Sequence, residues 1–193
     1  MDNFPIFLEI KNKPVLVIGG GDIAYRKIKL LIKSKPNIKV VAQNVCEEIL
    51  DLKEKYSIDI LKKEFHLDDI EFPIIIIAAT NNKSLNKQIA KEGLRKKIPV
   101  NVVDQPSLCT FTMGSIVERG SLVISISSGG KAPVLVRQLR EKIEKLIPDS
   151  YKDLVDLAGS LREKVKKLIK IDNKRRIFWE KFFCFLKYLI IRE

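Results

Sequence analysis

The sequence is poor in the residues that hold metals and disulfides. It contains one histidine, His66, and three cysteines, Cys46, Cys109 and Cys184, which lie far apart and form no CxxC pair. A zinc site or a disulfide framework is therefore not expected, and the reducing cytoplasm is the expected location. His66 falls in the stretch Phe65-His66-Leu67-Asp68-Asp69, which we interpret as a surface loop before a helical turn, so we expect an exposed loop histidine rather than a catalytic base.

Long apolar runs are also missing. The N-terminus lacks the basic start and apolar stretch of a signal peptide. The most apolar late segment, 177–191, contains Glu180, Lys181 and Lys187, and it is shorter than the roughly 20 apolar residues that a membrane helix needs. We therefore expect no membrane partner, and we interpret this segment as a helix that packs against protein.

Acidic residues are too few to balance the basic ones. The 193 residues include 36 Lys and Arg against 24 Asp and Glu, which gives a net charge of +12. Such a charge favours polyanionic partners, either nucleic acid or a small substrate with many carboxylates. Charge alone does not choose between them, because lysines such as Lys27, Lys29, Lys33 and Lys35 have the spacing of solvated surface.

Three consecutive glycines follow the apolar run Val15–Ile18 and precede a helical pattern. The motif reads Gly19-x-Gly21-x-x-Ala24. In such motifs the first glycine permits a tight turn, the second lets a diphosphate approach the backbone, and the small third residue lets helix and strand pack closely. The free N–H groups and positive dipole end of the helix favour a phosphate. A dinucleotide site is predicted; an ordinary glycine-rich turn is the alternative.

Strand and helix patterns alternate through the first half of the chain. Strands are expected at Val15–Ile18, Lys39–Ala42, Ile58–Leu61, Pro73–Ala79 and Val100–Val103, with helices at Ile23–Ser34, Cys46–Tyr56 and Ser84–Lys97. Strands that are apolar on successive residues are covered on both faces, as in parallel sheets. The alternation therefore predicts an α/β fold with a doubly wound parallel sheet, whose ligands bind beyond the carboxyl ends of the strands.

The pattern changes after Pro106. Residues Thr110–Val117 and Leu122–Ser127 predict a pair of antiparallel strands. The turn Ser127–Gly130 then leads into a helix from Pro133 to Leu146, and two further helices follow, with a break near Ile171–Lys174. Because the short strand pair has edges that invite pairing with a second copy, a homodimer is expected.

Five motifs resemble the precorrin-2 dehydrogenase / sirohydrochlorin ferrochelatase family, which forms the N-terminal half of siroheme synthases. They are FPIFLEIKNKPVLVIGGGDIAYRKIKLL, IIIIAATNN, PVNVVDQPSLCTF, SISSGGKAPVLVRQLREKIE and RRIFWEKFF. The resemblance implies a Rossmann-type NAD-binding domain over 1–112, a small α+β dimerisation region over 113–147 and a helical C-terminal domain over 148–193. It also implies a homodimer that oxidises precorrin-2 to sirohydrochlorin with NAD. Some family members insert Fe²⁺ as well, so iron as a further substrate stays open.

Polar or small residues that follow the strand ends are the expected cofactor contacts. They are Gly19, Gly21, Asp22, Ile23, Ala24, Gln43, Asn44, Thr80 and Asn81. An NAD site usually carries an acid about 20 residues beyond the glycines. Here Gln43 and Asn44 stand instead, without an arginine that would hold a 2′-phosphate, so NAD is favoured over NADP.

Asp104 ends an apolar strand at the same expected edge and is the predicted catalytic residue. A carboxylate there can act as general base for the proton that leaves the macrocycle, and the resemblance implies the same aspartate in metal insertion. Capping of the following turn is the alternative role. The expected substrate-binding residues are Ser128, which the resemblance places near the active site, and Gly129, Lys131, Arg137 and Arg140. A plain flexible turn, and arginines that only solubilise the helix, are the alternatives. No resident metal is expected.

Two other functions compete with the dehydrogenase. A non-catalytic NAD-binding regulatory module would use the basic surface to contact a protein or nucleic acid. A chelatase without dehydrogenase activity would not need the glycine motif. Asp104 together with the Ser127–Lys131 turn favours the enzyme, which acts on a tetrapyrrole and not on nucleic acid.

Overall fold

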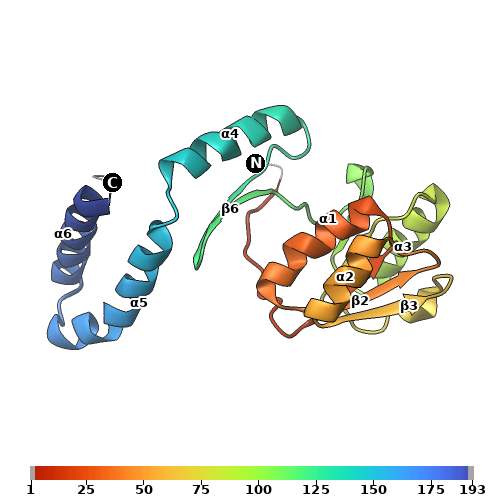
Figure 1. Cartoon of the computed structure of the whole chain (residues 1–193), viewed down its shortest axis with the longest axis horizontal. Helices are drawn as coiled ribbons and strands as arrows, with labels where there is room; N and C mark the ends of the chain where they lie inside the picture. Colours follow the sequence, from red (N-terminus) through yellow and green to blue (C-terminus); the bar gives the residue numbers. More distant parts are fainter. Residues whose placement is uncertain (1–2, 191–193) are drawn as a thin grey trace. The chain divides into compact units, whose positions relative to one another are not determined.

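The computed structural model describes the backbone of residues 3–190 and the side chains of residues 3–186 (Figure 1). The chain forms two compact units, Met1–Met113 and Gly114–Glu193. The first unit contains β1 (Pro14–Ile18), α1 (Asp22–Leu31), β2 (Asn37–Ala42), α2 (Glu47–Lys55), β3 (Ile58–Lys62), β4 (Ile75–Ala78), α3 (Lys83–Arg95) and β5 (Val100–Val102). The second contains β6 (Ser115–Arg119), β7 (Leu122–Ile126), α4 (Pro133–Leu146), α5 (Tyr151–Leu168) and α6 (Asp172–Ile190).

The first unit is built on a five-stranded parallel sheet in the order β3-β2-β1-β4-β5. Val15 of β1 pairs with Ile38 of β2 on one side and with Ile75 of β4 on the other. The strand order therefore reverses between β1 and β4, and ligands of such sheets bind beyond the carboxyl ends of the strands at this reversal. The predicted doubly wound parallel fold is confirmed.

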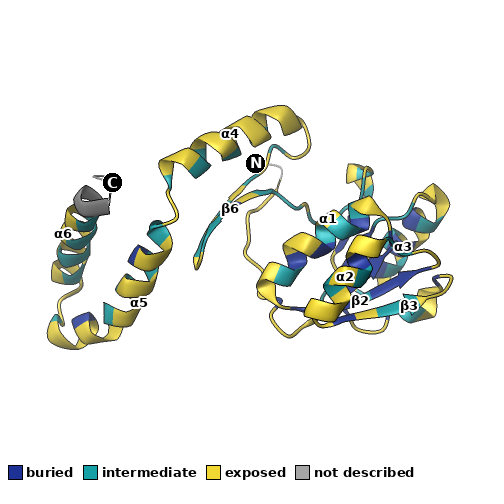
Figure 2. Cartoon of the chain, viewed as in Figure 1, coloured by how far each residue is buried: buried dark blue, intermediate teal, exposed yellow. Residues whose placement is uncertain are grey.

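Successive residues of the central strands pack on opposite faces of the sheet. Val15 and Val17 point to the face that α1 and α2 cover, whereas Leu16 and Ile18 point to the face that α3 covers. All four side chains are at most 2% exposed, which explains why the strand is apolar on every residue. Figure 2 shows this core as a buried sheet beneath more exposed helices.

The predicted strand Thr110–Val117 is wrong at its start, because the strand begins at Ser115. Thr110 instead binds the first residue of β5: its N–H donates to the Val100 carbonyl at 2.9 Å, and its hydroxyl accepts the Val100 N–H at 2.7 Å. Asn101, which is buried, donates to the Phe111 carbonyl at 3.0 Å. These hydrogen bonds fasten the segment to the first unit before the antiparallel pair begins.

The second unit pairs β6 with β7 as the predicted antiparallel hairpin, and α4 packs on β6. Arg119 fixes this packing, since its guanidinium donates to the carbonyls of Ile147 at 2.8 Å and Glu144 at 3.0 Å. The break between α5 and α6 falls at 169–171, earlier than predicted, and Arg175 donates to the Ile169 carbonyl there at 2.9 Å.

Few side chains of the second unit are fully buried. Val117, Leu154 and Val165 form its described core, while Leu146 and Leu168 are 75% and 83% exposed. On α6 four rings stack in edge and face contacts, at Phe178, Trp179, Phe182 and Phe183. Across residues 3–190, no helix has both the length and the apolar character that crossing a membrane requires.

Candidate functional site

The glycine turn sits where the strand order reverses. Gly19 has a φ of +115°, a region that side chains rarely adopt, and its N–H donates to the Val41 carbonyl at 3.0 Å. A Cβ at Gly19 would lie 2.3 Å from the Ala79 carbonyl oxygen. The turn is therefore held tightly between β2 and β4, and only glycine fits its first position.

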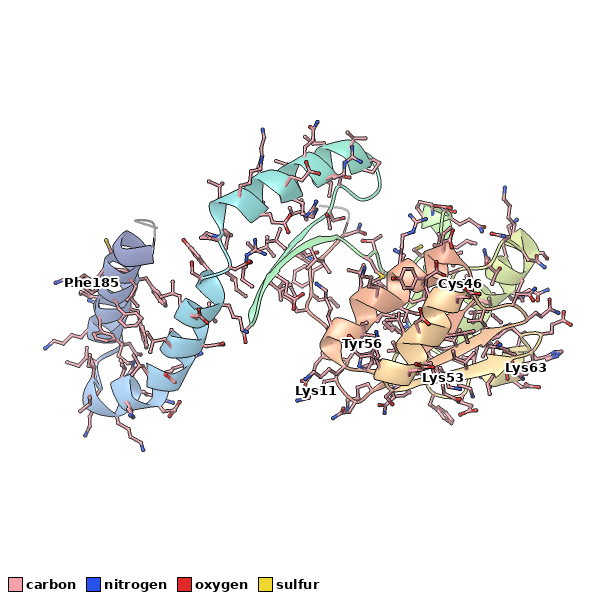
Figure 3. The ribbon with its side chains drawn as sticks, viewed as in Figure 1. Lys11, Cys46, Lys53, Tyr56, Lys63 and Phe185 are labelled. Carbon is pink, nitrogen blue, oxygen red and sulfur yellow. The ribbon has the colours of Figure 1, made fainter. Side chains whose placement is uncertain are left out.

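Gly20 joins this turn to the loop that follows β2. A Cβ at Gly20 would lie 2.2 Å from the Asn44 carbonyl oxygen, and the Cys46 N–H donates to the Gly20 carbonyl at 2.8 Å. Gln43 and Asn44 are exposed beside the turn, as a contact with a ribose requires. Figure 3 labels Cys46, which precedes the first turn of α2. Burial raises the pKa of its thiol, and the neighbouring Glu48 raises it further.

Gly21 leaves open space at the start of α1. It is the N-cap residue with φ −92° and makes no side-chain cap, and an added Cβ would meet nothing within 4 Å. The N–H groups of the first turn, at Asp22, Ile23 and Ala24, have no acceptor within the helix. Ala24 itself is fully buried against the sheet. A tight turn, open space and unsatisfied N–H groups together fit the diphosphate of a dinucleotide.

Thr80 follows β4 and organises the start of α3. Its hydroxyl donates to the Asn86 Oδ1 at 2.7 Å, and the Asn86 side chain donates back to the Thr80 carbonyl at 3.0 Å. The Asn82 side chain caps α3 by accepting the Leu85 N–H. Asn81 is exposed. Asn86 is 1% exposed, and its role in this turn was not predicted from the sequence. The signal in the sequence was a polar residue on the face of the predicted helix that packs against the sheet.

Asp104 follows β5 at the same carboxyl edge of the sheet. Its φ of +58° turns the chain sharply, and the loop is braced by the Val103 N–H, which donates to the Ala78 carbonyl at 3.0 Å. The Cys109 thiol packs on the Val102 backbone, with Sγ 3.2 Å from both its N and its O. Within residues 3–186, no group hydrogen-bonds the exposed Asp104 carboxylate, so turn capping does not account for it.

Lys27 does not belong to the solvated surface, contrary to the sequence interpretation. It lies half-buried on the second turn of α1, within electrostatic range of Asp104 and Cys109. Burial lowers the pKa of its ammonium group. Cys109 and Asp104 raise this pKa and so offset part of the effect, whereas the nearby positive charge of Arg26 lowers it further. A position next to the apolar stripe residues Ala24 and Ile28 was the signal in the sequence.

The other predicted site residues belong to the second unit, in the loop before α4 and on α4 itself. Gly129 and Gly130 have φ of +61° and +81°, and the Ser128 hydroxyl accepts the Ala132 N–H at 3.0 Å. Lys131 is exposed and donates its N–H to the Ser128 carbonyl. The loop is thus an ordered start of α4, and its role as an anion site stays a prediction.

The two arginines of α4 differ in their surroundings. Arg137 is exposed, whereas Arg140 is half-buried and pairs with Glu144 and Glu141 on its own helix. Arg140 therefore has carboxylate partners within the chain, while Arg137 keeps the exposed position that binding to a substrate requires. In the part of the chain that the structure describes, no three His, Cys, Asp or Glu residues gather as a metal site.

Three family models match the chain in order. They are a putative NAD(P)-binding family at residues 6–115, the sirohaem biosynthesis protein central region at 119–146 and the sirohaem synthase dimerisation region at 150–185. The NAD(P)-binding match includes the whole glycine turn and Asp104, which agrees with the predicted nicotinamide dinucleotide cofactor.

Siroheme synthases are similar along most of the chain. Those of Ruthia magnifica subsp. Calyptogena magnifica, Vesicomyosocius okutanii subsp. Calyptogena okutanii and Zymomonas mobilis subsp. mobilis are 48%, 46% and 42% identical, and each match covers 95% of this chain. The matched stretch is only 39% of each relative, so the chain spans about two fifths of their length.

The solved structure of SirC, a precorrin-2 dehydrogenase, shares the fold. It superposes with a TM-score of 0.79 over 93% of this chain and 88% of that chain, at 24% identity. Because the NAD(P)-binding model alone covers more than half of the chain and the two sirohaem models follow it, the chain belongs to the family that its motifs predicted, the NAD(P)-binding region of siroheme synthases.

Proposed function

We propose that the chain catalyses the NAD-dependent oxidation of precorrin-2 to sirohydrochlorin. The observation that carries the proposal is the position of Asp104: an exposed carboxylate, free of hydrogen bonds within residues 3–186, at the sheet edge that also bears the glycine turn. A regulatory dinucleotide-binding module has no need of such a carboxylate. The siroheme synthase relatives support the choice of substrate.

Each part of this edge has its own task in the reaction. The N–H groups at the start of α1 bind the diphosphate, and Gly21 leaves room for it. Bound NAD⁺ supplies the acceptor for the hydride that leaves the macrocycle. The Asp104 carboxylate accepts the proton that leaves with the oxidation, and its exposure lets the proton pass on to water. The Thr80–Asn86 pair holds the neighbouring β4–α3 turn in place.

The choice of NAD rests on the loop after β2. Gln43 and Asn44 can hydrogen-bond the ribose hydroxyls, and the first turn of α2 carries Glu47 and Glu48. Because the Cys46 N–H donates to the Gly20 carbonyl, the start of α2 lies beside the glycine turn, and carboxylates at this position would repel a 2′-phosphate. The Kd of NAD⁺ is therefore expected to be lower than that of NADP⁺, and the reverse order would contradict the assignment.

The remaining assignments are part of the same proposal. The chain divides into a cofactor domain (1–112), a dimerisation region (113–147) and a helical domain (148–193), and it works as a homodimer in the cytoplasm. The dimerisation-region match and the exposed apolar side chains of the second unit support the dimer. Sedimentation at micromolar concentration tests it, and a monomer would contradict it. The residues that bind the anionic substrate are Ser128, Gly129, Lys131 and Arg137. Arg140 joins them when its ion pair with Glu144 opens.

An anaerobic assay with precorrin-2 and NAD⁺ tests the activity by the appearance of NADH. The wild-type chain should produce NADH, and Asp104→Asn should lower turnover by about a hundredfold or more, the usual contribution of a general base. His66→Ala, a change in the exposed loop, should leave turnover unchanged. NAD⁺ binding without any NADH would favour the regulatory module instead. Fe²⁺ added after the oxidation tests whether the chain also takes iron as a substrate.

A further inference from the structure

Lys27 is a half-buried lysine whose charge no hydrogen bond or ion pair neutralises among the side chains of residues 3–186. Lys39 and Lys96 are the other half-buried lysines of the first unit, and both have partners: Lys39 pairs with Glu71 at 2.9 Å, and Lys96 donates to the Ile70 carbonyl. For Lys27 no hydrogen bond or ion pair occurs among the described side chains. A partly buried ammonium group without a partner among residues 3–186 loses some of its hydration and is available to bind an anion.

The surroundings of Lys27 point toward the reaction edge. Asp104, which follows β5, is the carboxylate within electrostatic range of Lys27, and the neighbouring Cys109 thiol packs on the Val102 backbone at the end of β5. Asp104 lacks a hydrogen-bond partner as well, within the same described residues. Two opposite charges thus stand near one another at the rim without closing into an ion pair. A substrate that carries carboxylates beside the atom to be deprotonated would satisfy Lys27 and leave Asp104 free.

We propose that Lys27 binds a carboxylate of the tetrapyrrole substrate and so places the reacting carbon beside Asp104. This inference rests on the proposed dehydrogenase function and adds a substrate-binding residue from the cofactor domain. The diphosphate is the competing anion. It is disfavoured because Lys27 lies on the second turn of α1, whereas the unsatisfied N–H groups belong to the first.

The test compares Lys27→Met with Lys29→Met. Methionine keeps the apolar stem of Lys27 and removes only the charge. Lys29 lies on the same helix but is exposed, with its ammonium group 5.9 Å from the Tyr25 ring, so its substitution removes the same charge from the same helix. Lys27→Arg restores the charge. The probe is uroporphyrin, a stable porphyrin whose side chains all end in carboxylates, titrated by fluorescence at saturating NAD⁺.

Lys27→Met should weaken porphyrin binding about tenfold, which corresponds to the loss of one charge-assisted hydrogen bond. Lys29→Met should stay within about twofold of wild type, as expected for an exposed charge, and Lys27→Arg should regain most of the affinity. The Kd of NAD⁺ should not change in any variant. Unchanged unfolding midpoints or higher ones would show that the variants fold.

Three other results would overturn the inference, each in a different way. Equal porphyrin affinities of the Lys27→Met and Lys29→Met proteins would assign Lys27 no role in substrate binding. A weaker Kd for NAD⁺ in Lys27→Met would assign it to the diphosphate. A wild-type protein that binds NAD⁺ but neither binds uroporphyrin nor oxidises precorrin-2 would refute the proposed function itself, and this inference with it.

Discussion

The carbonyl oxygen of Ala79 lies 2.3 Å from the point where a side chain at Gly19 would begin. The two residues follow β1 and β4, the pair of strands between which the sheet order reverses, and the Ala79 N–H donates to the Ile18 carbonyl at 2.8 Å. The end of β4 therefore forms one wall of the glycine turn. The requirement for glycine here comes from the packing of the protein on itself, before any cofactor is bound.

Gly19→Ala should accordingly damage the fold. The substitution places a methyl group against the Ala79 backbone and forces alanine to a φ of +115°, so a loss of about 2 kcal/mol or more in the free energy of unfolding is expected. Urea unfolding followed by circular dichroism measures this loss. A stability within error of wild type would mean that the turn can relax away from Ala79.

Gly21→Ala should leave the stability of the fold unchanged and weaken the binding of NAD⁺ instead. Its φ of −92° suits any residue, and an added Cβ meets no atom within 4 Å, so the free energy of unfolding should stay close to that of wild type. The methyl group would instead occupy the space that the diphosphate needs. A Kd for NAD⁺ at least about tenfold weaker is expected from calorimetry, since the backbone N–H groups can no longer be reached closely. Unimpaired NAD⁺ binding would place the diphosphate elsewhere.

Asp104 can be removed in two ways that differ in their structural consequences. Its φ of +58° is tolerated by asparagine better than by alanine, so Asp104→Asn should keep the wild-type unfolding midpoint, whereas Asp104→Ala should lose about 1 kcal/mol. Both substitutions remove the carboxylate, and both should lose most of the turnover. If only the alanine variant were impaired, the backbone conformation rather than the carboxylate would matter.

The sequence was sufficient for the elements that depend on local patterns. Strands covered on both faces carry apolar residues in succession, as Ile75, Ile76 and Ile77 do. These apolar runs predicted all five strands of the parallel sheet to within a few residues at each end. The glycine turn and Asp104 were placed at one edge because the carboxyl ends of parallel strands must meet there. These predictions needed no knowledge of the packing between helices.

Contacts between segments that are separated in the chain could not be predicted from the sequence. The sequence predicts a surface lysine at Lys27. In the folded chain the loop after β5 brings Asp104 and Cys109 near it, and no local pattern indicates this. The Thr110 segment is apolar and polar in alternation like a strand, but hydrogen bonds to Val100 fasten it to β5. In each case the partner, not the residue, decides the role.

Arg119→Met tests what stabilises the second unit. The guanidinium donates to the carbonyls of Ile147 and Glu144 and lies 3.1 Å from the Asp149 carboxylate, while its side chain is 11% exposed. Removing a charged donor from these partly buried carbonyl acceptors should lower the stability of this unit by about 2 kcal/mol. Limited proteolysis should then cut the chain earlier within 114–186, with the Kd of NAD⁺ unchanged. Unaltered proteolysis would mean that α4 packs on β6 without this clamp.

Lys27→Met gives a stability test of the half-buried charge that is independent of any ligand. Because the pKa of Lys27 lies below its ordinary value of 10.5, the unfolded chain binds this proton more tightly than the folded one. The charged form therefore destabilises the fold at neutral pH, and this penalty disappears as the pH rises from the folded-state pKa to 10.5. The Lys27→Met protein should be more stable than wild type at pH 7. Its advantage should shrink as the pH approaches 10.5, whereas Lys29→Met should show no such dependence. Urea unfolding of wild type, Lys27→Met and Lys29→Met across this pH range measures the effect. A difference between Lys27→Met and wild type that does not change with pH would mean that Lys27 is fully hydrated in the folded protein. The expected loss of stability from the Lys27 charge is typical of a residue that is retained to bind an anionic ligand.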